Sequence, residues 1–301
     1  MITKNAFVSI VGRANVGKSS LLNALIGEKI AAVSCKPQTT RTKITGVLTK
    51  DNTQYVFIDT PGMHKAKTKL SEHMVKAVNE SVTDNDISVL VVDASKVIGE
   101  NEKALIQSFK ASKIKAILVI NKIDLIDNKE NLMAKIAEYT SLYNFISVIP
   151  VSVLNNDGVD IVLSEIEKLA VEGPHYFPDD MLTDQPEKVI AAEIIREKML
   201  ELLSDEVPHG VAVGIETMSE RDTSSGETIL DIDAIIYCER DSHKGIVIGK
   251  GGAMLKRIGK LSREQLEEFF RIKVNLQCWV KVKEGWRNRE GIIKNFGLSS
   301  K

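Results

Sequence analysis

The segment that most constrains the fold is the glycine-rich stretch from Gly12 to Ser20, which matches the pattern G-x-x-x-x-G-K-[ST]. The apolar run 6–11 before it indicates a strand, and residues 21–26 after it indicate a helix. This order is typical of a phosphate-binding loop, because glycine lets successive backbone N–H groups point at one anion. The helix start adds free N–H donors and the positive end of its dipole.

Two side chains of this loop have the chemistry that a bound triphosphate needs. Lys18 supplies positive charge to the outer phosphates, and the Ser19 hydroxyl is placed to bind Mg²⁺. A glycine turn followed by a surface lysine is the alternative, which the flanking strand and helix disfavour. The predicted nucleotide-binding residues of this loop are Gly12, Arg13, Ala14, Asn15, Val16, Gly17, Lys18, Ser19 and Ser20.

Length and composition indicate a soluble protein of two domains. The chain has 301 residues, 43% of them hydrophobic and 27% charged. Its apolar runs are too short for a transmembrane helix, and the N-terminus does not resemble a signal peptide. The three scattered cysteines predict a protein of a reducing compartment, and their spacing does not match a zinc site. Residues 245–301 carry a net charge of +8 and residues 1–244 carry −9. The basic end predicts a polyanionic partner, with a solvated basic face as the alternative.

Apolar runs beyond the loop alternate with helical patterns. Runs 44–48 and 55–58 flank an Asp51-Asn52 turn and predict an antiparallel hairpin. The pattern then predicts strands at 87–93, 114–120 and 146–150 and helices at 102–111, 131–142 and 161–169. We therefore expect an α/β domain whose mostly parallel sheet is covered by helices on both faces. Ligands of such sheets bind at the carboxyl ends of the strands.

Polar motifs follow two of these strands. The Asp59 carboxylate is suited to hold Mg²⁺ through water, and Gly62 can approach a γ-phosphate. The same D-x-x-G pattern also occurs in ordinary turns. Here it indicates a nucleotide site because it lies about 40 residues after the phosphate-binding loop. Asn121-Lys122-Ile123-Asp124 suits guanine, because the carboxylate accepts from the base N1–H and N2–H₂, a donor pair that adenine lacks. The Lys122 stem covers the base, and Ser152 and Val153 offer backbone N–H groups to guanine O6.

With these motifs the sequence resembles a Ras-like GTPase domain, and Pro37-Gln38-Thr39-Thr40-Arg41 with Asp59-Thr60-Pro61-Gly62 resembles the bacterial Era family over essentially the whole chain. The resemblance implies GTP and GDP binding, Mg²⁺ and slow GTP hydrolysis. It implies that Thr40, with Thr39 as the fallback, reaches Mg²⁺ and the γ-phosphate from the polar loop 28–43. Ala14 and Val153 stand where the family usually has Pro and Ala, and both contribute mainly backbone.

Met63 stands where Ras-type enzymes place the glutamine that orients the attacking water. The water must therefore be oriented otherwise. Relatives of this type use a monovalent cation held by the loop asparagine, which predicts a K⁺ site at Asn15. The predicted catalytic residues are Asn15, Lys18, Thr40 and Gly62, with an intrinsic rate on the order of 10⁻⁴ s⁻¹.

The C-terminal part has a second pattern. A helix at 190–203 and strands at 210–218 and 228–238 precede a Gly-x-x-Gly loop that opens a basic helix, and an alternating strand follows at 273–283. This resembles a KH domain of the bacterial variant, type II, in the order helix, strand, strand, helix, strand; a plain tight turn is the alternative. Trp279 in the last strand either packs on a helix, the favoured interpretation, or stacks on a base. The predicted RNA-binding residues are Ile248, Gly249, Lys250, Gly251, Gly252, Lys256 and Arg257.

The predicted domains are a GTPase domain at 1–171, a linker at 172–187 and a smaller α+β KH domain at 188–301. The family resemblance implies a monomeric, cytoplasmic protein that binds the single-stranded 3′ end of 16S ribosomal RNA and assists assembly of the small (30S) subunit. It also implies peripheral contact with the inner face of the membrane, although no lipidation motif is present. Two rival functions are an RNA-binding module with a vestigial nucleotide site and a membrane-associated switch.

Overall fold

The computed structural model describes residues 2–63, 68–83, 85–224, 226–296 and 298. Its N-terminal half is a seven-stranded sheet in the order β2-β3-β1-β4-β5-β6, with the short β7 added beside the start of β1. The β2–β3 and β1–β7 pairs are antiparallel and the other pairs are parallel. The strands are β1 (Lys4–Val11), β2 (Ile44–Lys50), β3 (Thr53–Asp59), β4 (Ile87–Asp93), β5 (Lys115–Asn121), β6 (Ser147–Val151) and β7 (Val171–Glu172).

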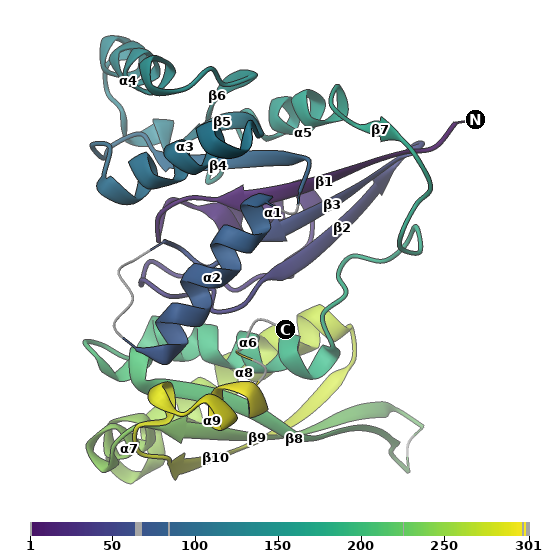
Figure 1. Ribbon diagram of the computed structural model, residues 1–301. Helices are drawn as coiled ribbons and strands as arrows, with labels where there is room; N and C mark the ends of the chain where they lie inside the picture. Colours follow the sequence, from purple (N-terminus) through teal and green to yellow (C-terminus); the bar gives the residue numbers. More distant parts are fainter. Residues whose placement is uncertain (1, 64–67, 84, 225, 297, 299–301) are drawn as a thin grey trace.

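Helices cover both faces of this sheet (Figure 1). Leu21 of α1 and Val162 of α5 pack into one buried cluster with side chains of β1, β3, β4 and β5, and Phe109 of α3 and Tyr139 of α4 pack into another with the opposite side chains of the strands. Near-continuous apolar strands such as β4, buried along its whole length, require this double cover. The helices are α1 (Lys18–Ile26), α2 (Lys69–Thr83), α3 (Glu100–Ser112), α4 (Lys129–Leu142) and α5 (Val159–Glu167).

The C-terminal half is a three-stranded sheet with its long helices on one face. Strand β9 lies in the middle, antiparallel to β8 and parallel to β10. Apolar side chains of α6, α7 and α8 pack on this sheet in one core. The elements are α6 (Glu187–Leu202), the 3₁₀ turn η2 (Val207–Gly210), β8 (Val211–Asp222), β9 (Thr228–Cys238), α7 (Asp241–Ile248), α8 (Ala253–Phe270), β10 (Lys273–Val282), η4 (Trp286–Asn288) and α9 (Glu290–Asn295).

The predicted fold class is confirmed, but three helices were not predicted. Helix α2 was missed although Leu70, Met74 and Val78 have helical spacing. Helix α9 follows the last predicted strand. Helix α7 lies directly before Gly249, so the predicted order helix, strand, strand, helix, strand lacked an element. Its apolar residues 246–248 are consecutive, a pattern that does not distinguish a short helix from a strand.

The segment 173–186 between the two halves runs along the edge strand β2. Val47 donates its backbone N–H to Leu182, and Thr183 donates its hydroxyl to the Thr45 carbonyl over 2.6 Å. The side chain of Gln54 bonds the backbone of Phe177 in both directions. The contacts of Val47 and Thr45 cover the open side of β2, which would otherwise expose unpaired backbone groups, and those of Gln54 hold the segment to the start of β3.

The two tryptophans have opposite surroundings. Trp279 is 46% exposed on the face of β10 away from the helices, so the prediction that it packs on a helix is wrong. The inward alternation of β10 is confirmed, since Val274, Leu276 and Cys278 pack into the core. Trp286 is fully buried, and its indole N–H donates to the Gly210 carbonyl over 3.0 Å.

The buried Trp286 also joins the two halves of the chain. It belongs to an apolar cluster in which Leu70 and Met74 of α2 meet Ala212 of β8 and Ile293 of α9. Figure 1 shows α9 lying over the β8–β9 sheet, below the end of α2.

Among the described helices, none is long and apolar enough to cross a membrane.

We expect Trp286→Ala to lower the free energy of unfolding by about 3–5 kcal/mol, because a large buried side chain leaves a cavity at this junction. Trp279→Ala, the matched control, should change it by less than about 1 kcal/mol. Urea denaturation followed by circular dichroism measures both. Equal losses for the two variants would contradict the assignment of Trp286 as the buried anchor.

Candidate nucleotide site and nucleic-acid groove

The loop between β1 and α1 has the backbone conformation of an anion cradle. Asn15 and Gly17 have positive φ angles of 64° and 99°, and Gly17 is the residue from which α1 starts. A Cβ atom on Gly17 would lie 2.2 Å from the side-chain nitrogen of Asn121, so only glycine fits there. The loop is therefore held against the motif that follows β5.

Lys18 and Asp59 are buried beside each other at the carboxyl edge of β1 and β3. Burial lowers the pKa of Lys18 and raises the pKa of Asp59, and the charge of each partner opposes the shift of the other. Lys18 donates to the Arg13 carbonyl over 2.9 Å. A buried ammonium beside the cradle is poised to neutralise phosphate oxygens.

Two hydroxyl groups, those of Ser19 and Thr40, converge on the Asp59 carboxylate and form with it a set of oxygen ligands suited to Mg²⁺. The Ser19 hydroxyl lies 2.5 Å from Asp59 Oδ2 and 2.8 Å from the Thr40 hydroxyl, and Thr40 lies 3.4 Å from the same carboxylate oxygen. The other oxygen of Asp59 is buried without a hydrogen-bond partner in the described part of the chain. Hydroxyls and an unpaired carboxylate oxygen form a donor set that fits Mg²⁺ and its water shell.

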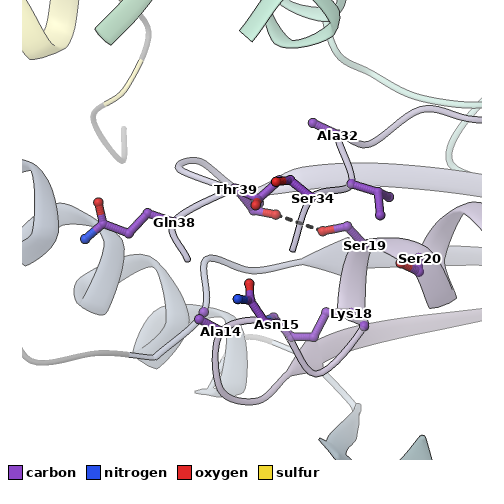
Figure 2. A pocket seen from close by; sticks show the side chains of 13 residues that line it. Ala14, Asn15, Lys18, Ser19, Ser20, Ala32, Ser34, Gln38 and Thr39 are labelled. Atoms are coloured by element: carbon purple, nitrogen blue, oxygen red, sulfur yellow. Dashed lines mark hydrogen bonds between the residues drawn. The ribbon is translucent and has the colours of Figure 1, made fainter. Parts of the chain in front are cut away.

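A cavity of about 50 Å³ lies between the phosphate loop and the polar loop 28–43. Figure 2 shows Asn15, Lys18 and Ser19 on one side of it and Ser34 and Thr39 on the other. Thr40, the predicted metal ligand, and Thr39, the fallback, both line this cavity, and Thr40 is the one of the two that contacts Ser19 and Asp59. The Asn15 amide donates to the Cys35 carbonyl over 2.5 Å.

Gly62 and Met63 lie against the phosphate loop. A Cβ on Gly62 would lie 2.5 Å from Ala14 Cα, so a side chain would displace the loop. Met63 donates its N–H to the Gly12 carbonyl over 3.2 Å, and its side chain packs on the core of α3 and β4. Asn101 of α3 donates to the Met63 carbonyl over 3.1 Å. This positioning contact was missed, because the sequence does not place a helix N-terminus beside Met63.

The motif after β5 forms the wall of a cavity of about 590 Å³. Asn121 donates to the Val16 carbonyl over 2.8 Å, and Lys122 donates to the Asn15 carbonyl and to Asp93 over 2.8 and 2.7 Å. Burial alone would raise the pKa of Asp93, but the hydrogen bonds from Lys122 and Ser95 lower it. The motif is therefore fastened to the phosphate loop, with the exposed Asp124 at the cavity.

The segment after β6 completes this cavity. Ser152 donates its hydroxyl to Asp124, which orients the carboxylate. The Ser152 N–H donates to Asp157, and the Val153 N–H donates to the Asn121 side chain over 3.1 Å. Both N–H groups that are predicted to bind guanine O6 thus have protein partners here, and that role stays a prediction. Leu125 and Leu154 supply exposed apolar walls for a base.

The C-terminal half carries a separate groove of about 570 Å³ between α8 and β10. Gly252 begins it at φ 82°, where a Cβ would meet open space, and Lys256, Lys260 and Arg263 follow on one face of α8. Leu276 and Cys278 of β10 line the other side. Lys260 and Arg263 were missed, although their spacing of four and seven residues from Lys256 places all three on one helix face.

The other predicted RNA-binding residues surround this groove rather than line it. Lys250 and Gly251 form the exposed turn at its end, and Gly249 packs tightly, since a Cβ there would lie 2.7 Å from Met254 Cβ. Ile248 ends α7 and is half-buried. Arg257 is exposed but lies one residue beyond Lys256, on an adjacent face of α8.

Comparison with known proteins gives the same two parts. Residues 7–122 match the family described as 50S ribosome-binding GTPase, and residues 206–287 match the KH domain family. GTPase Era of Clostridioides difficile (strain 630) is 51% identical over 99% of both chains, and GTPase Era of Ruminiclostridium cellulolyticum is 49% identical over 100% of this chain and 99% of that one.

A crystal structure of Era in complex with MgGDPNP and nucleotides 1506–1542 of 16S ribosomal RNA superposes with a TM-score of 0.94 at 36% identity, covering 99% of this chain and 100% of that one. A variant of Aquifex aeolicus Era bound to GDP·AlF₄⁻ gives the same score, identity and coverage.

Fold and site together define a P-loop GTPase joined to a KH RNA-binding domain. The protein binds guanine nucleotides and hydrolyses GTP. At this identity over nearly the full length, the chain belongs to the Era GTPase family.

We expect Asp124→Asn to weaken GTP binding by at least about 100-fold and to favour xanthosine triphosphate, because the amide matches the base carbonyl that replaces the guanine amino group. Asp127→Asn, three residues further along the same loop, is the control and should leave GTP binding unchanged. Titration with both nucleotides measures the preference. An unchanged GTP preference in Asp124→Asn would refute the guanine assignment.

Proposed function

We propose that this protein is a GTP-controlled switch that binds the single-stranded 3′ end of 16S ribosomal RNA and assists assembly of the 30S subunit. The observation that carries the proposal is the presence, in one chain, of a nucleotide site with phosphate, metal and base elements and of a basic groove opened by Gly-x-x-Gly. The Era structure solved with nucleotides 1506–1542 of 16S ribosomal RNA supports the choice of RNA.

In the nucleotide site, backbone N–H groups of the phosphate loop and Lys18 bind the phosphates. Ser19, Thr40 and Asp59 would hold Mg²⁺, which supplies charge neutralisation at the phosphate oxygens when bound. Gly62 brings its backbone N–H close to the γ-phosphate because no side chain intervenes. Asn15, Lys18, Thr40 and Gly62 are thus the residues that we assign to hydrolysis.

The contact between Asn15 and Cys35 supports the K⁺ site. The amide nitrogen of Asn15 donates to the Cys35 carbonyl on the opposite loop, so the Asn15 amide group, which also carries an oxygen, lies beside that carbonyl oxygen. Two neutral oxygens from facing loops suit a monovalent cation, whose charge can replace a side chain that stabilises the transition state. Met63 offers no such group, since its side chain packs in the core.

In the groove, RNA bases lie between the apolar side chains of β10 and α8 while the backbone passes Gly251 and Gly252. These glycines present no side chain to the nucleic acid. Lys250, Lys256 and Arg257 add electrostatic attraction, together with Lys260 and Arg263 inside the groove. Binding should therefore weaken steeply with salt.

We propose that the protein acts as a monomer and in the cytoplasm, where ribosomal subunits assemble. Peripheral membrane contact stays a prediction, and flotation with liposomes of anionic lipid tests it. An RNA-binding module with a vestigial nucleotide site is the rival, and the converging Ser19, Thr40 and Asp59 disfavour it. Absence of phosphate release from GTP would favour that rival.

Gly252→Asp should abolish binding of the 16S 3′-end RNA and leave GTP hydrolysis unchanged, because a carboxylate would enter the path of the phosphates. Gly226→Asp is the matched control: Gly226 has φ 83° against 82° for Gly252, and a Cβ meets open space at both. RNA affinity by filter binding and phosphate release measure the effects. Normal RNA affinity in Gly252→Asp would refute the groove assignment.

GTP hydrolysis should be faster in KCl than in NaCl by on the order of 10²-fold, the effect of one preorganised charge-stabilising group. Asn15→Gly should remove this preference without backbone strain, because the position already has a positive φ angle. Single-turnover phosphate release in the two salts is the measurement. Equal rates in both salts would eliminate the cation role of Asn15.

A further inference from the structure

The two neighbours of Thr40 in the chain are both bonded to the KH domain. The Thr39 carbonyl accepts a hydrogen bond from the guanidinium of Arg196 on α6. Arg41 donates to the Val211 carbonyl over 2.6 Å and to the His209 carbonyl over 3.1 Å. Thr40, which faces Ser19 and Asp59, therefore lies between two anchors on the other domain.

The anchor for Arg41 is a socket made of backbone carbonyls. Those of Pro208, His209 and Val211 all accept from the guanidinium, which lies 5.6 Å from the centre of the Trp286 ring; Arg41 as a whole is 2% exposed. Trp286 is itself fixed by its bond to Gly210. The planar guanidinium of arginine, with N–H donors spread along its edge, can reach all three carbonyls. The compact ammonium group of lysine cannot.

A third anchor lies earlier in the same loop. The ammonium of Lys36 donates to the carbonyl of Leu203, the residue that caps α6. The last carbonyls of a helix lack partners within it and carry the negative end of its dipole, so a cation is favourable there. Lys43, at the other end of the loop, instead contacts Glu80 of α2 over 3.4 Å, within the GTPase domain.

We propose that the KH domain, through Lys36, Arg41 and Arg196, holds the loop that carries Thr40 and thereby sets the affinity for GTP relative to GDP. The proposal rests on the assignment of Thr40 as a ligand of the GTP-bound metal. The three residues are positioning residues, because none of them lines the cavity between the phosphate loop and the loop 28–43, and they act through Thr40.

The anchored loop should favour GTP over GDP because of what the Thr40 hydroxyl can reach. Its hydroxyl faces the metal ligands and the cavity for the terminal phosphate, so holding it in place favours a triphosphate with metal and contributes little to a diphosphate. A loop that is already anchored loses less conformational freedom when GTP binds. By linkage, GTP must strengthen docking of the KH domain by the same factor.

The test measures affinities of the full chain for a fluorescent non-hydrolysable GTP analogue and for GDP, both with Mg²⁺ and without RNA. Arg41→Met, which keeps an apolar stem, should weaken binding of the GTP analogue about tenfold, within the usual range of coupling. Lys36→Met should weaken binding of the analogue about threefold. Because Lys36 lies half-buried at the loop surface, this variant leaves the core intact. GDP affinity should change by less than twofold in both variants.

Two further variants decide the mechanism. Lys43→Met removes a cation of the same loop that is anchored within the GTPase domain, and the ratio of the two affinities should stay unchanged. In a Thr40→Ala background, Arg41→Met should have no further effect on the analogue, because its action passes through Thr40.

Equal weakening of GTP analogue and GDP, or unchanged ratios in Lys36→Met and Arg41→Met, would overturn the proposal. So would a full additional loss in the Thr40→Ala background. These measurements contain no RNA, so they are independent of the 16S assignment, which the Gly252→Asp comparison tests by itself.

Discussion

A carboxylate and an ammonium group, Asp59 and Lys18, are buried side by side at the carboxyl edge of the sheet, and the nucleotide site is built around that pair. Removing both from water is costly, and their mutual attraction balances the cost only when other polar groups complete the site. Ser19 and Thr40 bond the carboxylate, and the Arg13 carbonyl accepts from the ammonium. One oxygen of Asp59 remains without a partner in the described residues. A metal-bound polyphosphate supplies the charges that this arrangement lacks.

Each of these groups comes from a different part of the chain, which explains why the surrounding structure is so constrained. The phosphate loop needs Gly17 against Asn121, β3 must end at Asp59, and the loop 28–43 must bring Thr40 back over both. The first two requirements are met inside the GTPase domain. The third involves the KH domain, because Arg41 and Arg196 bond across the domain boundary. The two domains therefore share the geometry of one site.

Local pattern made most of the fold and the nucleotide site predictable. The spacing of Lys18, Asp59 and Asp124 along alternating strands and helices specifies where a nucleotide lies, because parallel strands end at one edge. Trp279 was expected to pack on a helix from its residue type, although the alternation of β10 places it on the face away from the helices. Features that depend on distant packing were not predictable. Asn101 and Arg196 gain their roles from neighbours that no local spacing reveals.

The bond between Arg41 and the C-terminal half of the chain has a consequence for synthesis. Trp286, which completes the socket for Arg41, leaves the ribosome about 250 residues after it, a delay of roughly 10–50 s at ordinary elongation rates. Until then Arg41 lacks the Trp286 ring beside its guanidinium, although its carbonyl partners at residues 208–211 have already been made. A nascent chain that has not yet reached Trp286 therefore lacks the complete socket for Arg41, so synthesis of the C-terminal segment completes a contact of the nucleotide-binding domain.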